Sequence, residues 1–226
     1  MKTTERQKKI LEYVVSEYVE SARPISSQTL EKKYDLGVSP ATLRAEMLAL
    51  SEQGFLEKPH ASSGRVPTDK GYRFFVDEIL ENPKEYSDKA INADDTISPW
   101  RFAKNLASLT SSLVAVYLQE QEMIFKEGWE DLLAEPEFED HNSMKSFARL
   151  IEDFEWNIGD LSFGRGIEVF IGKEVLFSRV KDFSIIVAEC EFEENKKGIV
   201  AFLGPKRMEY PKNINILHSW TKRLKS

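Results

Sequence analysis

The feature that most constrains this chain is a helix that the sequence delimits at both ends, between Ser39 and Gly54. Serine is a preferred N-cap, Pro40 stands at the first helical position, where a missing amide proton does no harm, and glycine commonly follows a helix end. The helix is therefore predicted to run for about four turns. The apolar row that should face the domain core consists of Leu43, Met47 and Leu50.

The sequence before this helix predicts two more helices. A capping-box spacing of Thr4 and Gln7 starts the first one, and Pro24 marks the break after it. Ser26 or Ser27 can then cap a short second helix. The residues expected on the buried sides of these two helices are Ile10, Leu11, Val14, Val15, Tyr18, Leu30 and Tyr34.

The sequence after this helix predicts a hairpin and a further helix. Residues 55–58 and 64–66 read as two short strands joined by the turn PHASS, and Thr68 caps the helix that follows. Its inward residues are expected to be Tyr72, Phe75, Val76, Ile79 and Leu80. Three helices, a hairpin and a helix in this order are typical of a winged helix-turn-helix.

The hairpin carries the basic part of an acidic chain. The formal net charge is -7, yet residues 1–80 hold twelve Lys and Arg against twelve Asp and Glu, whereas residues 81–226 hold nineteen against twenty-six. From His60 to Phe75, three of the four charges are cations. A basic loop on a neutral module fits a protein that brings one surface to a polyanion, while the acidic remainder limits other contacts with it.

On this interpretation the helix after Ser39 is the recognition helix, which lies in the major groove. Its first turns present small side chains and a cation to base edges, and the free amides at its start suit a backbone phosphate. Arg44 is the first candidate for a base contact; a surface ion pair with Glu46 or Glu52 is the alternative. The residues of this helix predicted to touch DNA are Ser39, Ala41, Thr42, Arg44 and Ala45.

The hairpin tip is the predicted wing. Its serines and glycine let the backbone approach a sugar-phosphate surface, and Arg65 supplies a cation for a phosphate or a narrow minor groove. The wing and the residues beside it that are predicted to touch DNA are Lys58, His60, Ser62, Ser63, Gly64, Arg65, Lys70 and Arg73. A winged fold that serves protein contacts alone is the alternative.

A polar segment rich in helix breakers, residues 81–99, is predicted to link a winged-helix DNA-binding domain, residues 1–80, to a second domain, residues 100–226. Helices are expected over residues 101–109, 129–134, 143–161 and from about Lys212. Strands are expected over residues 113–118, 123–126, 167–171, 183–192 and 198–203. The second domain is thus predicted to be α+β, with helices covering one sheet.

Nothing in the sequence indicates an enzyme. Cys190 is the only cysteine, which excludes an internal disulfide and a cysteine-based metal site, and its apolar neighbours indicate a passive core thiol. His141 beside Asp140, and the pair Asp94 and Asp95, lie in predicted loops where charged side chains meet water. We expect no catalytic residue, cofactor or metal. The tryptophans are expected in the core or at an interface: Trp100, Trp129, Trp156 and Trp220.

The location expected for this protein is the cytoplasm. No stretch reaches the roughly 18 apolar residues of a membrane span, and the start, MKTTERQKKI, has no apolar block of the signal-peptide kind.

Two long stretches, LGVSPATLRAEM and KPHASSGRVPTDKGYRFFVD, lie within a segment, residues 4–77, that closely resembles the amino-terminal domain of the heat-inducible transcription repressor HrcA family. FKEGWEDLLAEPEF and GPKRMEYPKNI are similar to two stretches of the family's carboxy-terminal region. The resemblance implies a dimeric repressor that binds an inverted-repeat operator, called CIRCE, upstream of chaperone genes, supported by a GroEL-type chaperonin. It also implies that the second domain, with its mixed or antiparallel sheet, is GAF-like.

The chain departs from the family pattern at two points. Members are usually longer and carry a dimerisation segment inserted into the second domain, and the space before GWEDLL is too short for it, so the helix over residues 101–109 or a face of the sheet would have to mediate a dimer. The family commonly has Asn where this chain has Ala45. Asn reads adenine with two hydrogen bonds, whereas Ala offers only an apolar contact, for instance to a thymine methyl, so the preferred operator can differ.

The function expected is repression by occlusion of polymerase, with two chains on a pseudo-palindrome. The alternative is a sensor or interaction module, in which the GAF-like domain binds a ligand or a chaperonin and the winged helix contacts protein. GIEVFIG and KGIVAFLG carry no cluster of polar groups that would mark a ligand pocket.

Overall fold

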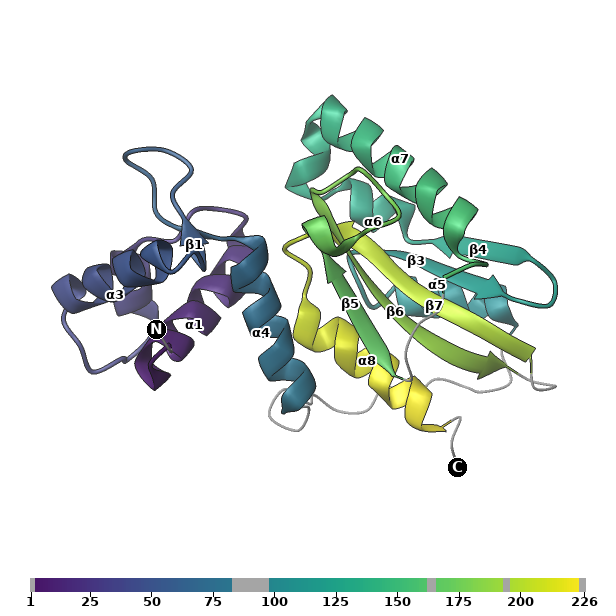
Figure 1. The fold of residues 1–226 in the computed structure, drawn as a ribbon, viewed down its shortest axis with the longest axis horizontal. Helices are drawn as coiled ribbons and strands as arrows, with labels where there is room; N and C mark the ends of the chain where they lie inside the picture. The colour runs from purple at the N-terminus through teal and green to yellow at the C-terminus, as the bar shows by residue number, and fades with distance from the viewer. Residues whose placement is uncertain (1–2, 83–97, 162–165, 193–195, 224–226) are drawn as a thin grey trace. The chain divides into compact units, whose positions relative to one another are not determined.

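The computed structural model describes residues 3–82, 98–161, 166–192 and 196–223, with side chains described as far as Ser219 (Figure 1). The chain divides into two compact units, Met1–Glu81 and Asn82–Ser226, called here the first and the second unit. Most of the predicted linker, residues 81–99, lies outside the described residues. The assignment of DNA binding to residues 1–80 and of a GAF-like domain to residues 100–226 stays a prediction.

The first unit contains the helices and the hairpin in the expected order. Its elements are α1 (Glu5–Ser21), α2 (Ser27–Lys33), α3 (Pro40–Glu52), β1 (Leu56–Glu57), β2 (Val66–Pro67) and α4 (Asp69–Glu81). The helix starts follow from their caps. Thr4 and Gln7 form the predicted capping box, Ser26 accepts a hydrogen bond from the amide of Thr29, and Thr68 accepts one from the amide of Gly71 at 3.1 Å.

The helices of the first unit pack by the faces that their periodicity marks. Helix α1 contacts α3 and α4, and α2 contacts α3, so one core lies among them. Leu80, in the last turn of α4, is only half-buried, which departs from its expected inward position. The fully buried side chains of this core include Ile10, Leu11, Val14, Val15, Leu30, Leu43, Leu50, Val76 and Ile79.

The second unit is an antiparallel sheet between helices. Its elements are α5 (Pro99–Ala107), β3 (Leu113–Leu118), β4 (Met123–Glu127), α6 (Trp129–Leu133), η1 (Pro136–Glu139), α7 (His141–Asn157), β5 (Ile167–Ile171), η2 (Gly172–Glu174), β6 (Phe183–Phe192), β7 (Lys196–Pro205) and α8 (Tyr210–Arg223). The strand order is β4-β3-β7-β6-β5, and every neighbouring pair is antiparallel. This confirms the α+β prediction.

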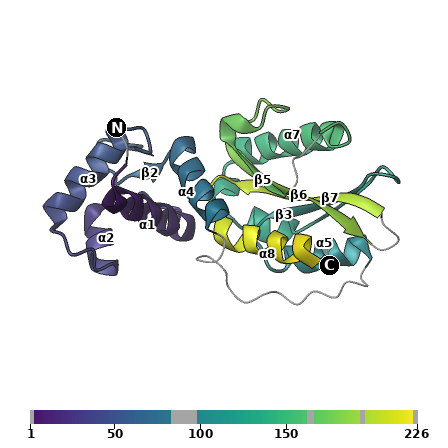
Figure 2. The same ribbon diagram turned by 60° about the horizontal axis from the view of Figure 1, so that its bottom comes forward.

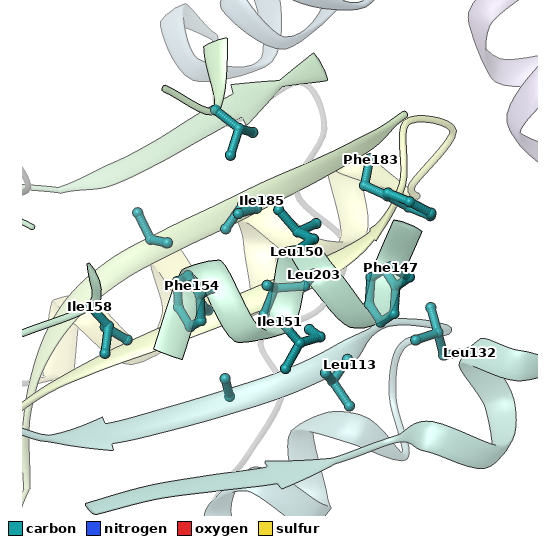
Figure 3. Packing of buried hydrophobic residues seen from close by; sticks show 14 of the residues in the cluster. Leu113, Leu132, Phe147, Leu150, Ile151, Phe154, Ile158, Phe183, Ile185 and Leu203 are labelled. Atoms are coloured by element: carbon teal, nitrogen blue, oxygen red, sulfur yellow. The ribbon is translucent and has the colours of Figure 1, made fainter. Parts of the chain in front are cut away.

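Helices cover both faces of this sheet. Figure 2 shows α7 on one side of the strands, and α5 and α8 on the other. The layer beneath α7 is built from alternate residues of the strands together with aromatic rings of the helix, as Figure 3 shows. Phe147 is central to this layer, because its ring lies 4.9 Å from that of Phe183 and 5.2 Å from that of Phe138, centroid to centroid.

Several single predictions for the second unit are corrected. Helix α7 begins at His141, because Asp140 caps it by accepting a hydrogen bond from the amide of Asn142 at 3.1 Å. The tryptophans were expected in the core or at an interface, and the 87% exposure of Trp156 excludes only the core for this residue. Cys190 lies in β6 as expected but is only half-buried, and burial raises the pKa of its thiol, which disfavours the reactive thiolate. Within the described part of the chain, no helix combines the length and apolar character that crossing a bilayer requires.

Candidate nucleic-acid interface

Helix α3 presents the predicted DNA-contacting residues on its outer side. Leu43, Met47 and Leu50 are buried, which fixes the helix on the core, while Ala41, Arg44 and Ala45 are exposed. The alternative role of Arg44, an ion pair on the helix surface, is not observed among the described residues. Its proposed partner Glu46 instead accepts a hydrogen bond from Gln7 at 2.9 Å and pairs with Arg6 at 3.5 Å, which ties α3 to α1.

The start of α3 uses most of its polar groups internally. The hydroxyl of Ser39 accepts a hydrogen bond from the amide of Thr42 at 3.2 Å, and its carbonyl accepts one from the amide of Leu43 at 3.0 Å. Pro40 has no amide proton. In the part of the chain that the structure describes, the amide of Ala41 is therefore the one first-turn donor left for an external acceptor such as a phosphate oxygen.

The hairpin after α3 is shorter than predicted, and its second strand is shifted. Only two residue pairs form the ladder, Leu56 with Pro67 and Glu57 with Val66. The prediction of a strand over residues 64–66 was wrong because the residues before Val66 pair with a third segment. Arg65 and Ile25 exchange both backbone hydrogen bonds, each 2.8 Å long.

This third pairing explains Gly64. A Cβ atom at this position would lie 2.4 Å from the carbonyl oxygen of Ile25, closer than atoms can approach, so the close packing of the two backbones requires glycine. Gly64 and Arg65 therefore lie at the base of the wing. The sequence had suggested that they lie at its tip. Arg65 is half-buried, and its Nε atom is buried without a hydrogen-bond partner among the described residues.

The tip itself, residues 58–63, is a loop that projects from the unit beside β1 (Figure 1). Ser63 shapes it, because its hydroxyl donates to the carbonyl of His60 at 2.8 Å and accepts from the amide of His60 at 3.0 Å. The ammonium of Lys58 donates to the carbonyl of Ala61 across the loop. The side chains of Lys58, His60 and Ser62 are exposed, so the tip offers one cation and two hydrogen-bonding groups to a ligand.

The two predicted DNA-contacting cations of α4, Lys70 and Arg73, both make contacts within the first unit. Lys70 donates to the carbonyl of Gln53, at the end of α3, at 2.7 Å, and its ammonium lies 4.3 Å from the centre of the Phe55 ring. A lysine at a helix C-terminus satisfies a free carbonyl and interacts favourably with the helix dipole. Arg73 pairs with Asp77 at 3.3 Å. Arg44, Lys58 and Lys70 are all exposed, but Lys58 and Lys70 each donate to a backbone carbonyl, so Arg44 is the most accessible of these three to a polyanion.

A buried carboxylate fastens the helix-turn-helix. Glu17 on α1 is only 6% exposed, and it receives the ammonium of Lys33 at 2.8 Å and the phenol of Tyr34 at 2.5 Å. Burial opposes the charge of Glu17, but these two donors outweigh it, so the pKa of Glu17 lies below its ordinary value. The rings of Tyr13 and Tyr34 stack at 3.9 Å beside it. The sequence reasoning missed this contact, which links α1 to the end of α2.

Replacing Tyr34 by Phe should lower the free energy of unfolding of the first unit by about 1.5–3 kcal/mol, because a buried charge loses a hydrogen-bond donor. Burial and the bond to Glu17 raise the pKa of Tyr34 from 10.0 to about 12. The folded state therefore holds this proton more tightly, and the associated stability, complete below pH 10, is lost as the pH rises towards 12.

Urea unfolding followed by circular dichroism between pH 10 and pH 12 tests this contact, because the wild type should lose more stability over that range than Tyr34→Phe does. Tryptophan fluorescence serves as the internal control, since all four tryptophans belong to the second unit. Parallel loss of stability in both proteins would contradict the assigned role of the phenol.

In the second unit, an ion cluster joins the two stretches that carry the family resemblance. Arg207, 9% exposed in the turn before α8, donates to Glu137 at 2.6 and 2.7 Å and also to Glu135. Burial opposes the charge of Arg207, but its bonds to the two carboxylates outweigh it and raise the pKa of the guanidinium. Arg207 lies 70 and 72 positions from Glu137 and Glu135 in the chain, so the cluster ties η1 and the residue before it to the turn between β7 and α8.

Comparison with known proteins agrees with this architecture. The heat-inducible transcription repressor HrcA of Chloroflexus aggregans is 27% identical over 335 residues, covering 94% of this chain and 89% of the relative. The protein of the same name from Thermoanaerobacter sp. is 29% identical over 336 residues, covering 99% and 96%. Both alignments are longer than the 226 residues of this chain, so each relative contains segments that this chain lacks.

A solved crystal structure described as a hypothetical protein has the same fold, with a TM-score of 0.81 and 20% identity over 99% of this chain and 98% of that one. The fold is thus α+β, a winged helix-turn-helix followed by a GAF-like domain. The family model described as HrcA protein C terminal domain matches residues 76–214. Since that match covers more than half of the sequence, the chain belongs to the HrcA family.

Proposed function

We propose that this chain is a transcriptional repressor of heat-shock genes, which binds an inverted-repeat, CIRCE-like operator as a homodimer. The observation that carries the proposal is the outer face of α3, where Arg44 is exposed and makes no ion pair among the described residues, on the same small unit as a wing with the exposed cation Lys58. The printed names of the relatives, heat-inducible transcription repressor, support the biological role.

In the proposed complex, α3 enters the major groove and Arg44 forms two hydrogen bonds with guanine, the commonest specific contact of arginine. The wing tip places Lys58, His60 and Ser62 along the sugar-phosphate backbone. Arg65, at the wing base, reaches a phosphate or the minor groove, while Lys70 and Arg73 contribute at the periphery. Two chains related by a two-fold axis cover both half-sites and exclude polymerase.

In the proposed homodimer, the two chains cannot meet through an uncovered face of the sheet. Helices cover both faces of the sheet in the second unit, which leaves the helix surfaces and the edge strands β4 and β5 for a partner (Figure 2). On α5, the side chain of Trp100 is 45% exposed and its indole is held in place by a hydrogen bond to Glu127 at 2.6 Å, so this helix offers a large fixed ring to a partner. We therefore favour α5, the helix expected from the sequence, over a sheet face.

The alternative proposal, a module whose GAF-like domain binds a ligand or a chaperonin, has less support. The layer between α7 and the sheet is filled by the unit's own rings, among them Phe147, Phe154 and Phe183 (Figure 3). A ligand in that layer would have to displace them. A chaperonin would bind the outside of the unit, which does not conflict with DNA binding by the first unit.

Replacing Arg44 by Ala should weaken operator binding by about 5- to 150-fold for each half-site, hence by the square of that factor for the dimer, and should relax specificity at one base pair of each half-site, which is the expected effect of losing a bidentate contact to guanine. Replacing Arg65 by Ala should weaken binding by a similar factor on all sequences. The operator is first recovered by pulldown of genomic fragments, and affinities are then measured by gel shift. Arg149→Ala, which removes an exposed cation from α7, is the matched control. If both interface variants bind like the wild type, the assigned interface is wrong.

A further inference from the structure

One large apolar side chain of α3 points outwards. Leu48 is 49% exposed, and among the described residues of the first unit it is the only large hydrophobic side chain in that condition. It does not belong to the inward row of Leu43, Met47 and Leu50, all of which are buried. The core therefore does not account for Leu48.

Leu48 completes a row on the outer face of α3. Ala41, Arg44, Ala45 and Leu48 have the spacing i, i+3, i+4 and i+7, which places side chains on one side of a helix, and all four are exposed. Homeodomains read the major groove with four residues of their recognition helix at this same spacing. The row of this chain consists of one cation and three apolar groups.

Acidic side chains mark the limits of this row. Glu46 is turned towards α1, where it binds Gln7 and Arg6, so it does not face the outer side. The next position of the row after Leu48 is Glu52, which is exposed and would be repelled by phosphates. The surface suited to a polyanion therefore ends at Leu48, one turn before the acid.

We propose that Leu48, together with Ala45, determines operator specificity by packing against the 5-methyl groups of thymines in the major groove. The inference rests on the proposed DNA binding. The methyl group of thymine is the apolar group that a base pair presents in this groove. Leu48 lies about 6 Å from Arg44 along the helix axis, which corresponds to about two base-pair steps. Each half-site therefore contains thymine within about two base pairs of the guanine bound by Arg44.

The test replaces each thymine of the recovered operator by deoxyuridine, which removes the methyl group and leaves the hydrogen-bonding edge unchanged. Wild-type protein should lose about fourfold in affinity for each contacted methyl, the expected value for one buried carbon. Leu48→Ala should bind the thymine operator about fourfold more weakly for each half-site, and it should show no further loss at the deoxyuridines that Leu48 contacts, while it keeps the response at those that Ala45 contacts. Leu133→Ala, another exposed leucine but on α6, is the matched control.

The outcomes separate this inference from the proposed function. If wild type and Leu48→Ala respond identically to every deoxyuridine, while Arg44→Ala still loses binding, Leu48 is an ordinary exposed leucine and the inference is overturned. If the wild type binds no duplex in dilute buffer, the proposed function fails and the inference fails with it.

Discussion

Raising the salt concentration from about 50 to about 200 mM should weaken operator binding by roughly three to five decades, if a dimer neutralises about eight phosphates. Each protomer offers Lys58 at the wing tip and Arg65 at its base, and Lys70 and Arg73 can add to them from α4. Binding releases the cations condensed on those phosphates, so the logarithm of the affinity falls linearly with the logarithm of the salt concentration.

Fluorescence anisotropy over a salt series measures this slope. Lys58→Ala should reduce it by about two for a dimer, one per protomer, whereas Arg44→Ala should change the affinity with little change of slope. The comparison separates a phosphate contact from a base contact. An affinity that stays constant over the salt series would contradict nucleic-acid binding through this surface.

Replacing Arg207 by Met should destabilise the second unit by about 3–5 kcal/mol. The substitution leaves the carboxylates of Glu135 and Glu137 beside each other without the guanidinium that both of them bind. This is a large part of the total, because domains are typically stable by only about 5–15 kcal/mol. The variant should consequently unfold at a lower temperature.

Urea unfolding monitored by tryptophan fluorescence reports on the second unit and provides the measurement. The matched control is Lys212→Ala, which removes an exposed cation paired with Glu209 at 2.9 Å and should change stability by less than about 0.5 kcal/mol. Adding Glu137→Gln to Arg207→Met should recover part of the loss, since it removes one of the uncompensated charges. Equal stabilities of Arg207→Met and the control would show that the cluster contributes nothing.

The helices and the long strands could be predicted from sequence because their signals are local. Ser39 and Thr4 cap helices through bonds to residues three positions away, and the apolar rows repeat within one element. The limits of β3, β5 and β6 were predicted correctly for the same reason. Leu48 was not singled out from the sequence, because only its exposed area shows that it projects outwards.

Contacts between distant segments could not be predicted from one sequence. Three contacts join residues that are far apart in the sequence and meet only in the folded chain. They are the pairing of Ile25 with Arg65, the bond from Lys70 to the end of α3 and the cluster around Arg207. Cations such as Lys70 were assigned to DNA because a sequence shows their charge and not their partners. The serine and glycine positions of the wing likewise gave no sign of which of them packs against protein.

The bridge between Ile25 and Arg65 has a consequence for protein engineering. The wing is a ribbon of three segments, one of which belongs to the connection between α1 and α2. A chimaera that receives only residues 56–67 from a donor repressor would carry a wing whose base, at residue 65, no longer matches the segment around residue 25 with which it pairs. Residues 22–26 must therefore be transplanted with it, and libraries that randomise the loop alone should hold Gly64 constant.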